Sequence, residues 1–335
     1  MNQAQEILPA EVPLSTLLPV NKEEDPTVPF QYWNPYSYVK AINHHRERLS
    51  LPKPGQFDQL SKETKSTLLS DIFFDGARAD LTKILSPNFQ VMHSFQLGQG
   101  AAPSSFNFAA VFANEKTLMH GGMDTEGNLQ SRFHYNWTNA FTTKMQAQVH
   151  KDPNRSMLQA EAEYDGSDYI VNAKAVNPSI DSTGIFMANY LQSITKKLSV
   201  GTEIMIQKPF PGVQESVLSF AARYTPNPES VWVAQTQGAN IFTASYWKKI
   251  SPKCDACAEI QIVNIDSQNR RDATVNAGAK YEFATATYRA QIDNNFKVSM
   301  LLEEKIAPGF SFLLSGEMDH LKGENKFGFG LQLES

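Results

Sequence analysis

Apolar and polar residues alternate in short segments over most of this chain, a pattern that predicts β-strands with one apolar and one polar face. In one such segment, Leu158, Ala160, Ala162 and Tyr164 occupy one face, and the polar residues between them occupy the other. Gly, Pro, Asn and Asp separate the segments, as expected of turns. We divide the chain from residue 71 onward into nineteen strands: 71–82, 88–97, 105–114, 117–124, 128–136, 140–149, 156–164, 167–176, 181–191, 198–207, 214–224, 229–236, 240–248, 255–263, 273–281, 283–292, 296–304, 309–318 and 325–334.

The composition of the two strand faces favours a membrane barrel over a sheet in water. The polar face is rich in Ser, Thr, Gln, Asn and Gly, and the apolar face is rich in Ala, Phe, Met and Tyr. Strands of about 9–11 residues have the length that crosses a bilayer. No other part of the chain is long enough to cover the apolar faces, whereas lipid covers them if the sheet closes and leaves no unpaired edge. The sequence therefore predicts an all-β fold, a nineteen-stranded transmembrane β-barrel over residues 71–335.

Two regions of different texture precede the strands. Residues 1–36 hold many prolines and an acidic cluster, which is typical of a flexible tail. Residues 37–70 predict two helices, the first capped by Ser37 and the second by Asp58, with Phe57 placed to pack on the following turn. The second helix is mostly polar, so we expect it to lie against a polar surface.

Composition and charge exclude several classes of protein. The chain has 335 residues and a net charge of −5, which argues against a nucleic-acid-binding surface. Two cysteines exclude a disulfide framework. The longest apolar run, residues 108–113, is far shorter than the roughly 18 residues of a spanning helix. The N-terminal stretch has neither the basic nor the apolar region of a secretory signal, and it is too acidic for a mitochondrial presequence.

The sequence contains no pattern that predicts an enzyme. His44 and His45 are adjacent on the first predicted helix, without a carboxylate pattern that would make them metal ligands. Cys254 and Cys257 form a single C-x-x-C where a loop meets a strand, not before a helix as in a redox motif. Phosphate-binding loops, dinucleotide fingerprints and nucleophile elbows are all missing from the sequence. We therefore expect no catalytic residue, no cofactor and no metal.

Several longer motifs resemble the central pore subunits of the translocase of the mitochondrial outer membrane, the fungal-type members above all. They keep the order and spacing of that family from about residue 37 to the end. The motifs are PGQFDQL (54–60), GARADLTK (76–83), GGMDTEGNLQSRFHY (121–135), AEYDGSDY (162–169), NPSIDSTGIFMANYLQSIT (177–195), GAKYEF (278–283), QIDNNFKVSMLLEEK (291–305) and GEMDHLKGENKFGFGLQLE (316–334).

The resemblance implies a nineteen-stranded barrel of the mitochondrial outer membrane, closed by parallel pairing of its first and last strands. It implies an N-terminal helix in the pore, here the segment of Phe57, Asp58 and Leu60, which we expect to use its polar flank against the wall. Unfolded precursor proteins with presequences would pass through this pore. The implied partners are a receptor subunit, small single-helix subunits, further copies of the barrel and membrane lipid, with no nucleic acid. Both termini would face the intermembrane space.

The same family carries a sorting signal in its last strand, which Lys326, Gly328, Leu331 and Leu333 match here. A channel for basic presequences needs attraction that is weak and repeated, because a tight site would trap the chain. Carboxylates on the wet pore wall supply such attraction. We expect three of them at strand ends, forming an acidic exit cluster near the barrel seam, and two more at the cytosolic mouth. The exit cluster is Asp80, Glu303 and Glu334, and the mouth residues are Asp124 and Glu126.

Two rival interpretations remain at this stage. A voltage-dependent metabolite or anion porin of the same membrane shares the strand count, but it predicts a basic lumen and a shorter N-terminal extension. A soluble β-sandwich that binds other molecules also alternates, but it would be extracted without detergent. Glu304 departs from the family pattern, in which a basic residue often follows the acidic one, so a contact with a neighbouring subunit there stays open.

Overall fold

The structure is a computed structural model that describes residues 46, 49–70, 72–98, 104–152, 155–179, 183–210, 212–238, 240–265 and 270–335. Residues 50–335 form one compact unit. The predicted tail and almost all of the first predicted helix, with His44 and His45, lie outside the described residues. Among the described helices, none has both the length and the apolar character needed to cross a membrane.

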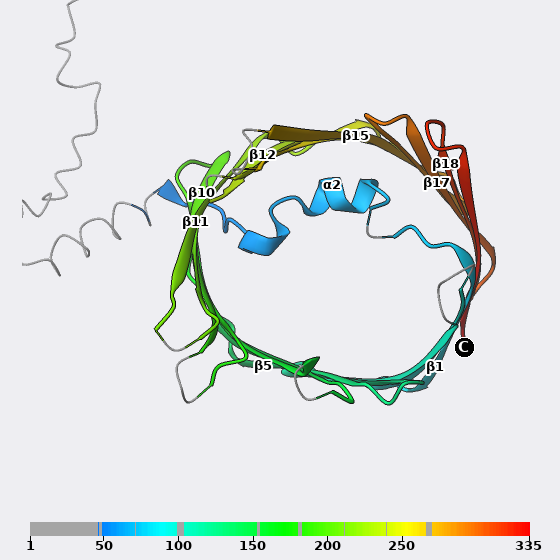
Figure 1. The fold of residues 1–335 in the computed structure, drawn as a ribbon, viewed down its shortest axis with the longest axis horizontal. Coiled ribbons are helices and arrows are strands. Elements are labelled where there is room, and N and C mark those ends of the chain that lie inside the picture. Colours follow the sequence, from blue (N-terminus) through cyan, green and yellow to red (C-terminus); the bar gives the residue numbers. More distant parts are fainter. Residues whose placement is uncertain are drawn as a thin grey trace, which may run out of the picture. The chain divides into compact units, whose positions relative to one another are not determined.

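Nineteen strands form a single sheet that closes on itself, which confirms the predicted fold and strand number (Figure 1). The first strand begins at Gly76, later than the expected residue 71. The strands are β1 (Gly76–Ser86), β2 (Phe89–Leu97), β3 (Ser105–Ala113), β4 (Thr117–Asp124), β5 (Leu129–Thr138), β6 (Phe141–Val149), β7 (Met157–Asp165), β8 (Tyr169–Val176), β9 (Gly184–Ser193), β10 (Leu198–Lys208), β11 (Glu215–Asn227), β12 (Ser230–Gln237), β13 (Ile241–Ser251), β14 (Cys254–Ile265), β15 (Arg270–Glu282), β16 (Ala286–Asp293), β17 (Lys297–Ala307), β18 (Phe310–Asp319) and β19 (Glu324–Glu334).

Sequential strands pair antiparallel, and the seam between β1 and β19 is parallel, with Gly76 opposite Gly328 and Thr82 opposite Glu334. The chain end strengthens the seam, since Ser335 N–H donates to the Thr82 carbonyl and Ile84 N–H donates to the Ser335 carbonyl. An odd number of strands requires one parallel pair if neighbours are otherwise antiparallel. The seam is therefore a consequence of the strand count, and closure leaves no unpaired edge.

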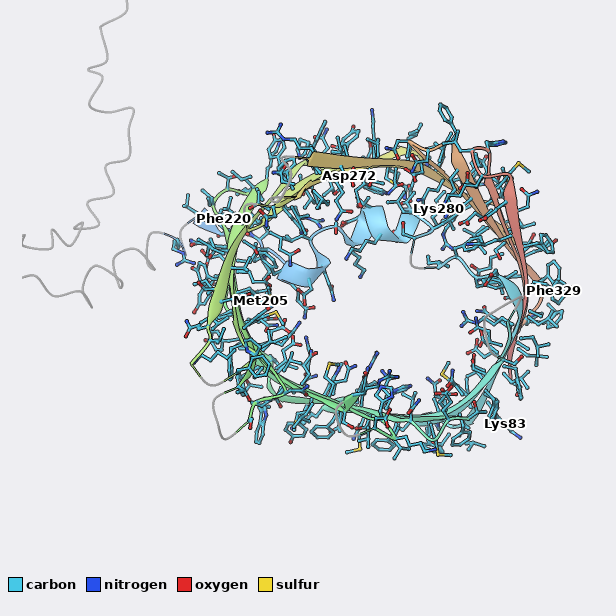
Figure 2. All side chains as sticks on the ribbon, viewed as in Figure 1. Lys83, Met205, Phe220, Asp272, Lys280 and Phe329 are labelled. Carbon is cyan, nitrogen blue, oxygen red and sulfur yellow. The ribbon has the colours of Figure 1, made fainter. Side chains whose placement is uncertain are left out.

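Alternation places one face of every strand toward the lumen and the other outward (Figure 2). Phe220 and Phe329 point outward and are half-exposed, whereas Lys280 and Met205 point inward (Figure 2). Directly paired residues of neighbouring strands share a face, so the inward or outward orientation of residues in one strand fixes that of their partners in the next strand. Large apolar side chains exposed on the outer face are what a lipid environment covers.

The turns divide the barrel into two unlike rims. We call the edge where β1 and β19 both end the C-terminal rim, and the other edge the opposite rim. Connections at the C-terminal rim are two to four residues long, and those at the opposite rim are three to seven residues long. The chain enters the lumen at the C-terminal rim, where the Ser193 hydroxyl donates to the Pro52 carbonyl at 2.7 Å and Lys53 lies 3.7 Å from Asp165.

Inside the barrel, residues 50–70 and 72–75 form what we call the lumen segment. It contains the three-residue 3-10 turn η2 (Phe57–Gln59) and the six-residue helix α2 (Lys62–Thr67), which runs along the wall formed by β13, β14 and β15 (Figure 1). The resemblance placed a helix in the pore, and the structure confirms a helical segment there.

Candidate functional site: the lumen wall and the segment attached to it

Apolar burial fixes the first half of the lumen segment to the wall. Leu60, which is 1% exposed, occupies a pocket formed by Leu191, Ala221, Val231 and Val233, with Phe57 and Trp247 at its margin. These wall residues come from the lumen-facing positions of β9, β11 and β12. Full burial of a leucine is worth about 1.5–3 kcal/mol, so this contact is a principal anchor.

Arg223 of β11 clamps the turn between η2 and α2. Its Nη1 donates to the Leu60 carbonyl at 2.6 Å and to Glu63 Oε2 at 3.0 Å, and its Nη2 donates to Glu63 Oε1 at 2.6 Å. A two-pronged pair of this kind fixes orientation as well as position. The guanidinium also satisfies the Leu60 carbonyl, which lies just before the helix that begins at Lys62.

The buried side of α2 is formed by Thr64 and Thr67, both almost inaccessible, which rest on Cys257 of β14. Leu68 then lies over Gly278 of β15, where an added Cβ would come within 2.9 Å of the leucine methyl. Because Gly278 has no side chain, it leaves the space that Leu68 fills. A larger residue at position 278 would displace Leu68.

The second half of the segment is held close to the seam. Leu69 and Phe74 pack with Leu301 and Leu313, and the Leu69 N–H donates to the Gln291 side chain at 2.7 Å. The Ser315 hydroxyl of β18 donates to the Phe74 carbonyl. The segment is thus attached at intervals from β7 to β19, along its whole length.

One expectation about this segment is wrong, and another holds only in part. Asp58 does not cap a helix over 57–69; Gln56 and Ser61 precede the two short elements, and neither makes a side-chain cap bond. Asp58 instead forms an ion pair with Lys174 of β8 at 3.0 Å. The wall contact is only partly the expected polar flank: Thr64, Thr67 and Glu63 contact the wall, but the segment's leucines are buried there as well. The apolar periodicity of residues 57–69 did not reveal this contact face, because these residues form two short elements that do not share one helical period.

Charged residues gather on the lumen face. Among the described side chains of the strands, alternation and register place eleven basic ones on the lumen face: Arg78, Arg132, Lys144, Lys174, Arg223, Lys249, Lys280, Arg289, Lys297, Lys305 and Lys326. Seventeen acidic side chains share that face: Asp80, Asp124, Glu161, Glu163, Asp165, Glu203, Glu215, Asp255, Glu259, Asp272, Glu282, Asp293, Glu303, Glu317, Asp319, Glu324 and Glu334. Acid therefore exceeds base on the described strands of the lumen wall.

One acidic group on the lumen wall was not among the candidates chosen from the sequence. Glu161 and Glu163 of β7 lie beside Lys144 of β6, with Nζ–Oε distances of 3.3 and 2.5 Å. Gln56 of the lumen segment donates to Glu163 at 2.6 Å, and Asn172 of β8 donates to Glu161 at 2.6 Å. The alternation already placed both glutamates on the polar face, but their partners depend on strand register, which alternation alone does not fix.

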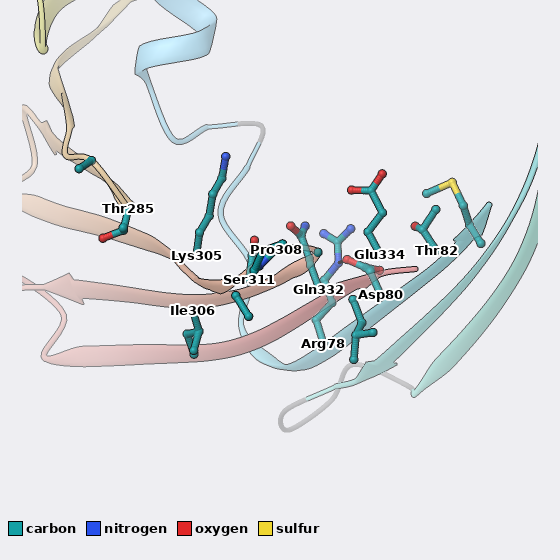
Figure 3. A pocket seen from close by; sticks show the side chains of 15 residues that line it. Arg78, Asp80, Thr82, Thr285, Lys305, Ile306, Pro308, Ser311, Gln332 and Glu334 are labelled. Carbon is teal, nitrogen blue, oxygen red and sulfur yellow. Dashed lines mark ion pairs between the residues drawn. The ribbon is translucent and has the colours of Figure 1, made fainter. Parts of the chain in front are cut away.

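The candidate acids near the seam are only partly brought together. Asp80 and Glu334 line one hollow with Arg78 and Lys305, and Figure 3 shows these side chains around it. Arg78 lies 2.7 Å from Asp80, so that carboxylate has its own counter-ion. Asp80 lies mid-strand, and not at the end of β1 as expected, because β1 continues to Ser86.

Glu303 lies apart from the other two seam acids. It is at the register level of Arg78 but three strands away, at about 14 Å for strands roughly 4.8 Å apart, and its neighbour is Arg289 at 3.9 Å. It also does not end its strand, since β17 continues to Ala307. The hollow at the seam therefore contains both signs of charge.

The candidates at the mouth lie at the opposite rim. Asp124 ends β4 with lumen-facing parity and accepts hydrogen bonds from the backbone and hydroxyl of Thr125. Glu126 is exposed in the following turn. The two are separated along the barrel axis from Asp80, Glu303 and Glu334, as the strand directions require.

The residues that match the sorting signal all lie in β19. Lys326 and Gly328 face the lumen, where Lys326 lies 3.4 Å from Glu317, and Leu331 and Leu333 face outward. A Cβ at Gly328 would collide with the Ser315 hydroxyl and the Phe74 carbonyl. The glycine is thus required by the folded barrel, in addition to any part it has in sorting.

The two cysteines are free. Cys254 has outward parity and Cys257 faces the lumen, because positions three apart on a strand lie on opposite faces. A disulfide between them is excluded by this geometry. Glu304 has outward parity, opposite Ala286 and Phe312, and is exposed.

Comparison with known proteins agrees with this architecture. Residues 53–330 match the family described as eukaryotic porin. The mitochondrial import receptor subunit TOM40 of Saccharomyces cerevisiae is 33% identical over 320 residues, covering 88% of this chain and 82% of that protein. The Neurospora crassa subunit tom40 is 33% identical over 310 residues, covering 88% and 87%. The Homo sapiens TOM40 homolog is 29% identical over 296 residues, covering 84% and 79%. The chain therefore belongs to the eukaryotic porins and, among them, to the TOM40 family.

Proposed function

We propose that this outer-membrane barrel of mitochondria is a protein-conducting channel that imports unfolded precursor proteins, guided by acidic and polar patches on its lumen wall. The observation that carries the proposal is the excess of acid over base on the lumen-facing strand positions. Presequences are basic and amphipathic, so a wall of this sign attracts them. Because the wall is wet and its charges are screened, each contact is weak enough to release the chain.

The attached lumen segment supports the same function. It narrows the pore without closing it, and its contacts are buried leucines and an arginine clamp, so it stays on one side of the wall. The wall from β1 to β6 has no fully buried side chain among its described residues. A translocating chain therefore has one uncovered wall to move along. That wall carries two of the lumen acids and three of the lumen bases, so the acidic excess that attracts presequences lies on β7–β19.

The orientation is part of the proposal. Bacterial outer-membrane barrels have short turns on the periplasmic side and longer loops outside. By analogy, the C-terminal rim, with its shorter turns, faces the intermembrane space, and so does the point where residues 50–53 enter the lumen. Asp124 and Glu126 then lie at the cytosolic mouth, and Asp80, Glu303 and Glu334 face the exit half. The expected partners are a receptor subunit, single-helix subunits and further barrels.

The test is the reversal potential of the purified full chain in a planar bilayer under a salt gradient, with and without a basic presequence peptide. Cation preference with brief blocks by the peptide is the expected result. Anion preference without any response to the peptide would overturn the proposal and favour the metabolite porin.

A matched pair of variants locates the effect. Glu334→Gln removes one charge from the lumen face, and Glu304→Gln removes one from the outer face near the same rim. We expect the first to weaken cation preference and shorten the peptide blocks, and the second to leave both unchanged. Equal effects would mean that overall charge, and not the lumen wall, sets selectivity.

A further inference from the structure

Tyrosine and tryptophan are confined to one end of the outer face. All eight tyrosines of residues 50–335 have outward parity, seven of them in the strand halves nearer the C-terminal rim and Tyr246 at the midpoint of β13. Six of the outward tyrosine and tryptophan side chains are strongly exposed: Trp137 (62%), Trp232 (50%), Tyr164 (45%), Tyr224 (45%), Tyr281 (40%) and Tyr190 (38%). We call the outward tyrosines with Trp137 and Trp232 the aromatic belt.

The outer face near the opposite rim is apolar but has a different composition. Its exposed large side chains are those of Phe, Leu, Met, Ile and Val, for example Phe95, Leu129 and Leu218. Among the described residues of that half, no tyrosine or tryptophan faces outward. The difference is therefore between rings with a polar tip and purely apolar side chains, and not between apolar and polar surface.

Neighbouring belt residues contact one another across the strands. The ring centroids of Tyr135 and Trp137 are 4.9 Å apart, and those of Trp232 and Tyr246 are 4.0 Å apart. Tyr169 lies between Tyr164 and Tyr190, at 6.2 and 6.0 Å. Such pairs hold the rings at one level of the barrel.

Outward basic side chains lie near both rims, and Lys208 and Arg271 are those close to the opposite rim. Lys248 follows Tyr246 by one outward position on β13, and Lys83 is near the end of β1. Long lysine side chains at this height extend toward phosphate groups while their stems remain in the apolar layer. Basic side chains therefore fit a phospholipid headgroup layer at either rim, and only the amphipathic rings distinguish the C-terminal rim.

We propose that the aromatic belt anchors the C-terminal rim in the phospholipid headgroup layer, and that the opposite rim has no equivalent anchor. Transmembrane barrels ordinarily carry aromatic residues at both interfaces, which fixes both ends. With a single belt, the depth of the barrel is set from one side. When the bilayer thickens, the C-terminal rim keeps its depth and the opposite rim sinks below its own headgroup layer. This inference does not depend on what the pore conducts.

The experiment uses the full chain in phosphatidylcholine vesicles with short, medium and long acyl chains, and measures tryptophan depth by quenching with lipids brominated at two depths. One variant keeps Trp232 as its sole tryptophan, and another carries Phe95→Trp as its sole tryptophan. Each position is the third residue from its own rim. A third variant keeps Trp247, on the lumen face, as the control that lipid does not reach.

We expect Trp232 to keep its depth below the headgroups across the vesicle series, and the tryptophan introduced by Phe95→Trp to become deeper as the chains lengthen. The introduced ring itself favours the interface, so it works against this outcome. Three outcomes would each overturn the proposal. They are equal sinking at both positions, a fixed depth at the Phe95 position only, and no quenching of Trp232 because protein covers it.

A second set of variants tests the hydroxyl groups directly. Tyr164→Phe, Tyr190→Phe and Tyr224→Phe keep the rings and remove only the polar tips. We expect Trp232 in this triple variant to lose its constant depth and sink with bilayer thickness. An unchanged depth would show that ring size alone, without the polar tip, sets the position and would overturn the anchoring role of the tyrosines.

Discussion

The wall under the lumen segment and the wall opposite it differ in what their inward side chains contact. From β7 to β19 the lumen face holds buried residues such as Leu191, Ala221 and Leu301. From β1 to β6 none of the described residues is buried. Figure 1 shows the same contrast, with α2 beside β15 and the wall of β1 and β5 uncovered.

This difference divides the lumen face into a covered wall that holds the segment and an uncovered wall that we assign to conduction. On the covered wall, leucines and threonines of the segment fill pockets between strands, and Arg223 is paired with Glu63. Amides and hydroxyls are the largest group of side chains on the uncovered wall from β2 to β6, for example Gln96, Gln130 and Gln146. Neutral polar groups of this kind make weak contacts with a passing chain and do not trap it, so we assign the path of the translocating precursor to this wall.

The largest expected effect is on the attachment of the segment. Leu60→Ala should lower the free energy needed to detach it by about 2–5 kcal/mol, because the substitution leaves a cavity among Leu191, Val231 and Val233. Hydrogen exchange of the α2 amides measures the change. Val111→Ala, on the uncovered wall, removes two methyl groups from a position that the segment does not touch and should leave that exchange unaltered.

The next effect concerns the seam. Gly328→Ala should destabilise the barrel by about 1–3 kcal/mol, because the new methyl group meets the Ser315 hydroxyl and the Phe74 carbonyl. Thermal unfolding after refolding in detergent measures this without the cellular sorting machinery. Gly121→Ala is the matched control, since nothing lies within 4 Å of the added atom. Equal stability of the two variants would mean that Gly328 serves sorting alone.

Arg223→Gln should weaken the attachment by about 1–2 kcal/mol. Hydrogen bonds to charged groups are worth about 1.5–3 kcal/mol, and the partial exposure of this pair reduces that value. Faster proteolysis within residues 60–69 in detergent would report the loss. Arg132→Gln makes the same charge change on the uncovered wall, and there the cleavage rate should not rise.

The smallest effect is expected at Asp58. Its carboxylate pairs with Lys174 but is more than half exposed, so Asp58→Asn should change the attachment by less than about 1 kcal/mol. Hydrogen exchange of α2 again provides the measurement. A change as large as that of Leu60→Ala would show that ion pairs, and not apolar burial, hold the segment.

The sequence predicted the barrel well because apolar and polar residues alternate with the same two-residue period in strand after strand. Leu158, Ala160, Ala162 and Tyr164 face outward as expected, and all nineteen strands exist. Strand ends were less accurate, since β1 extends from Gly76 to Ser86 and leaves Asp80 in its middle. Alternation does not mark where pairing stops, because the last paired residue depends on the neighbouring strand.

The candidate site was harder to predict because it depends on register. Lys144 beside Glu163, and Arg223 beside Glu63, come from positions far apart in the chain. The leucines of the segment were visible in the sequence, but the wall pocket for Leu60 required residues of three separate strands. Local pattern identifies which face a residue occupies, and closure of the barrel decides what it meets.

The central claim, that precursors pass along the uncovered wall, is tested most directly by photo-crosslinking to a precursor arrested in transit. The photoreactive residue is placed in turn at Gln146 on the uncovered wall, at Ser245 on the covered wall, and at the adjacent outward position Met145. We expect adducts with the precursor from Gln146 only. Adducts of equal yield from Ser245, or from Met145 without Gln146, would contradict the assignment.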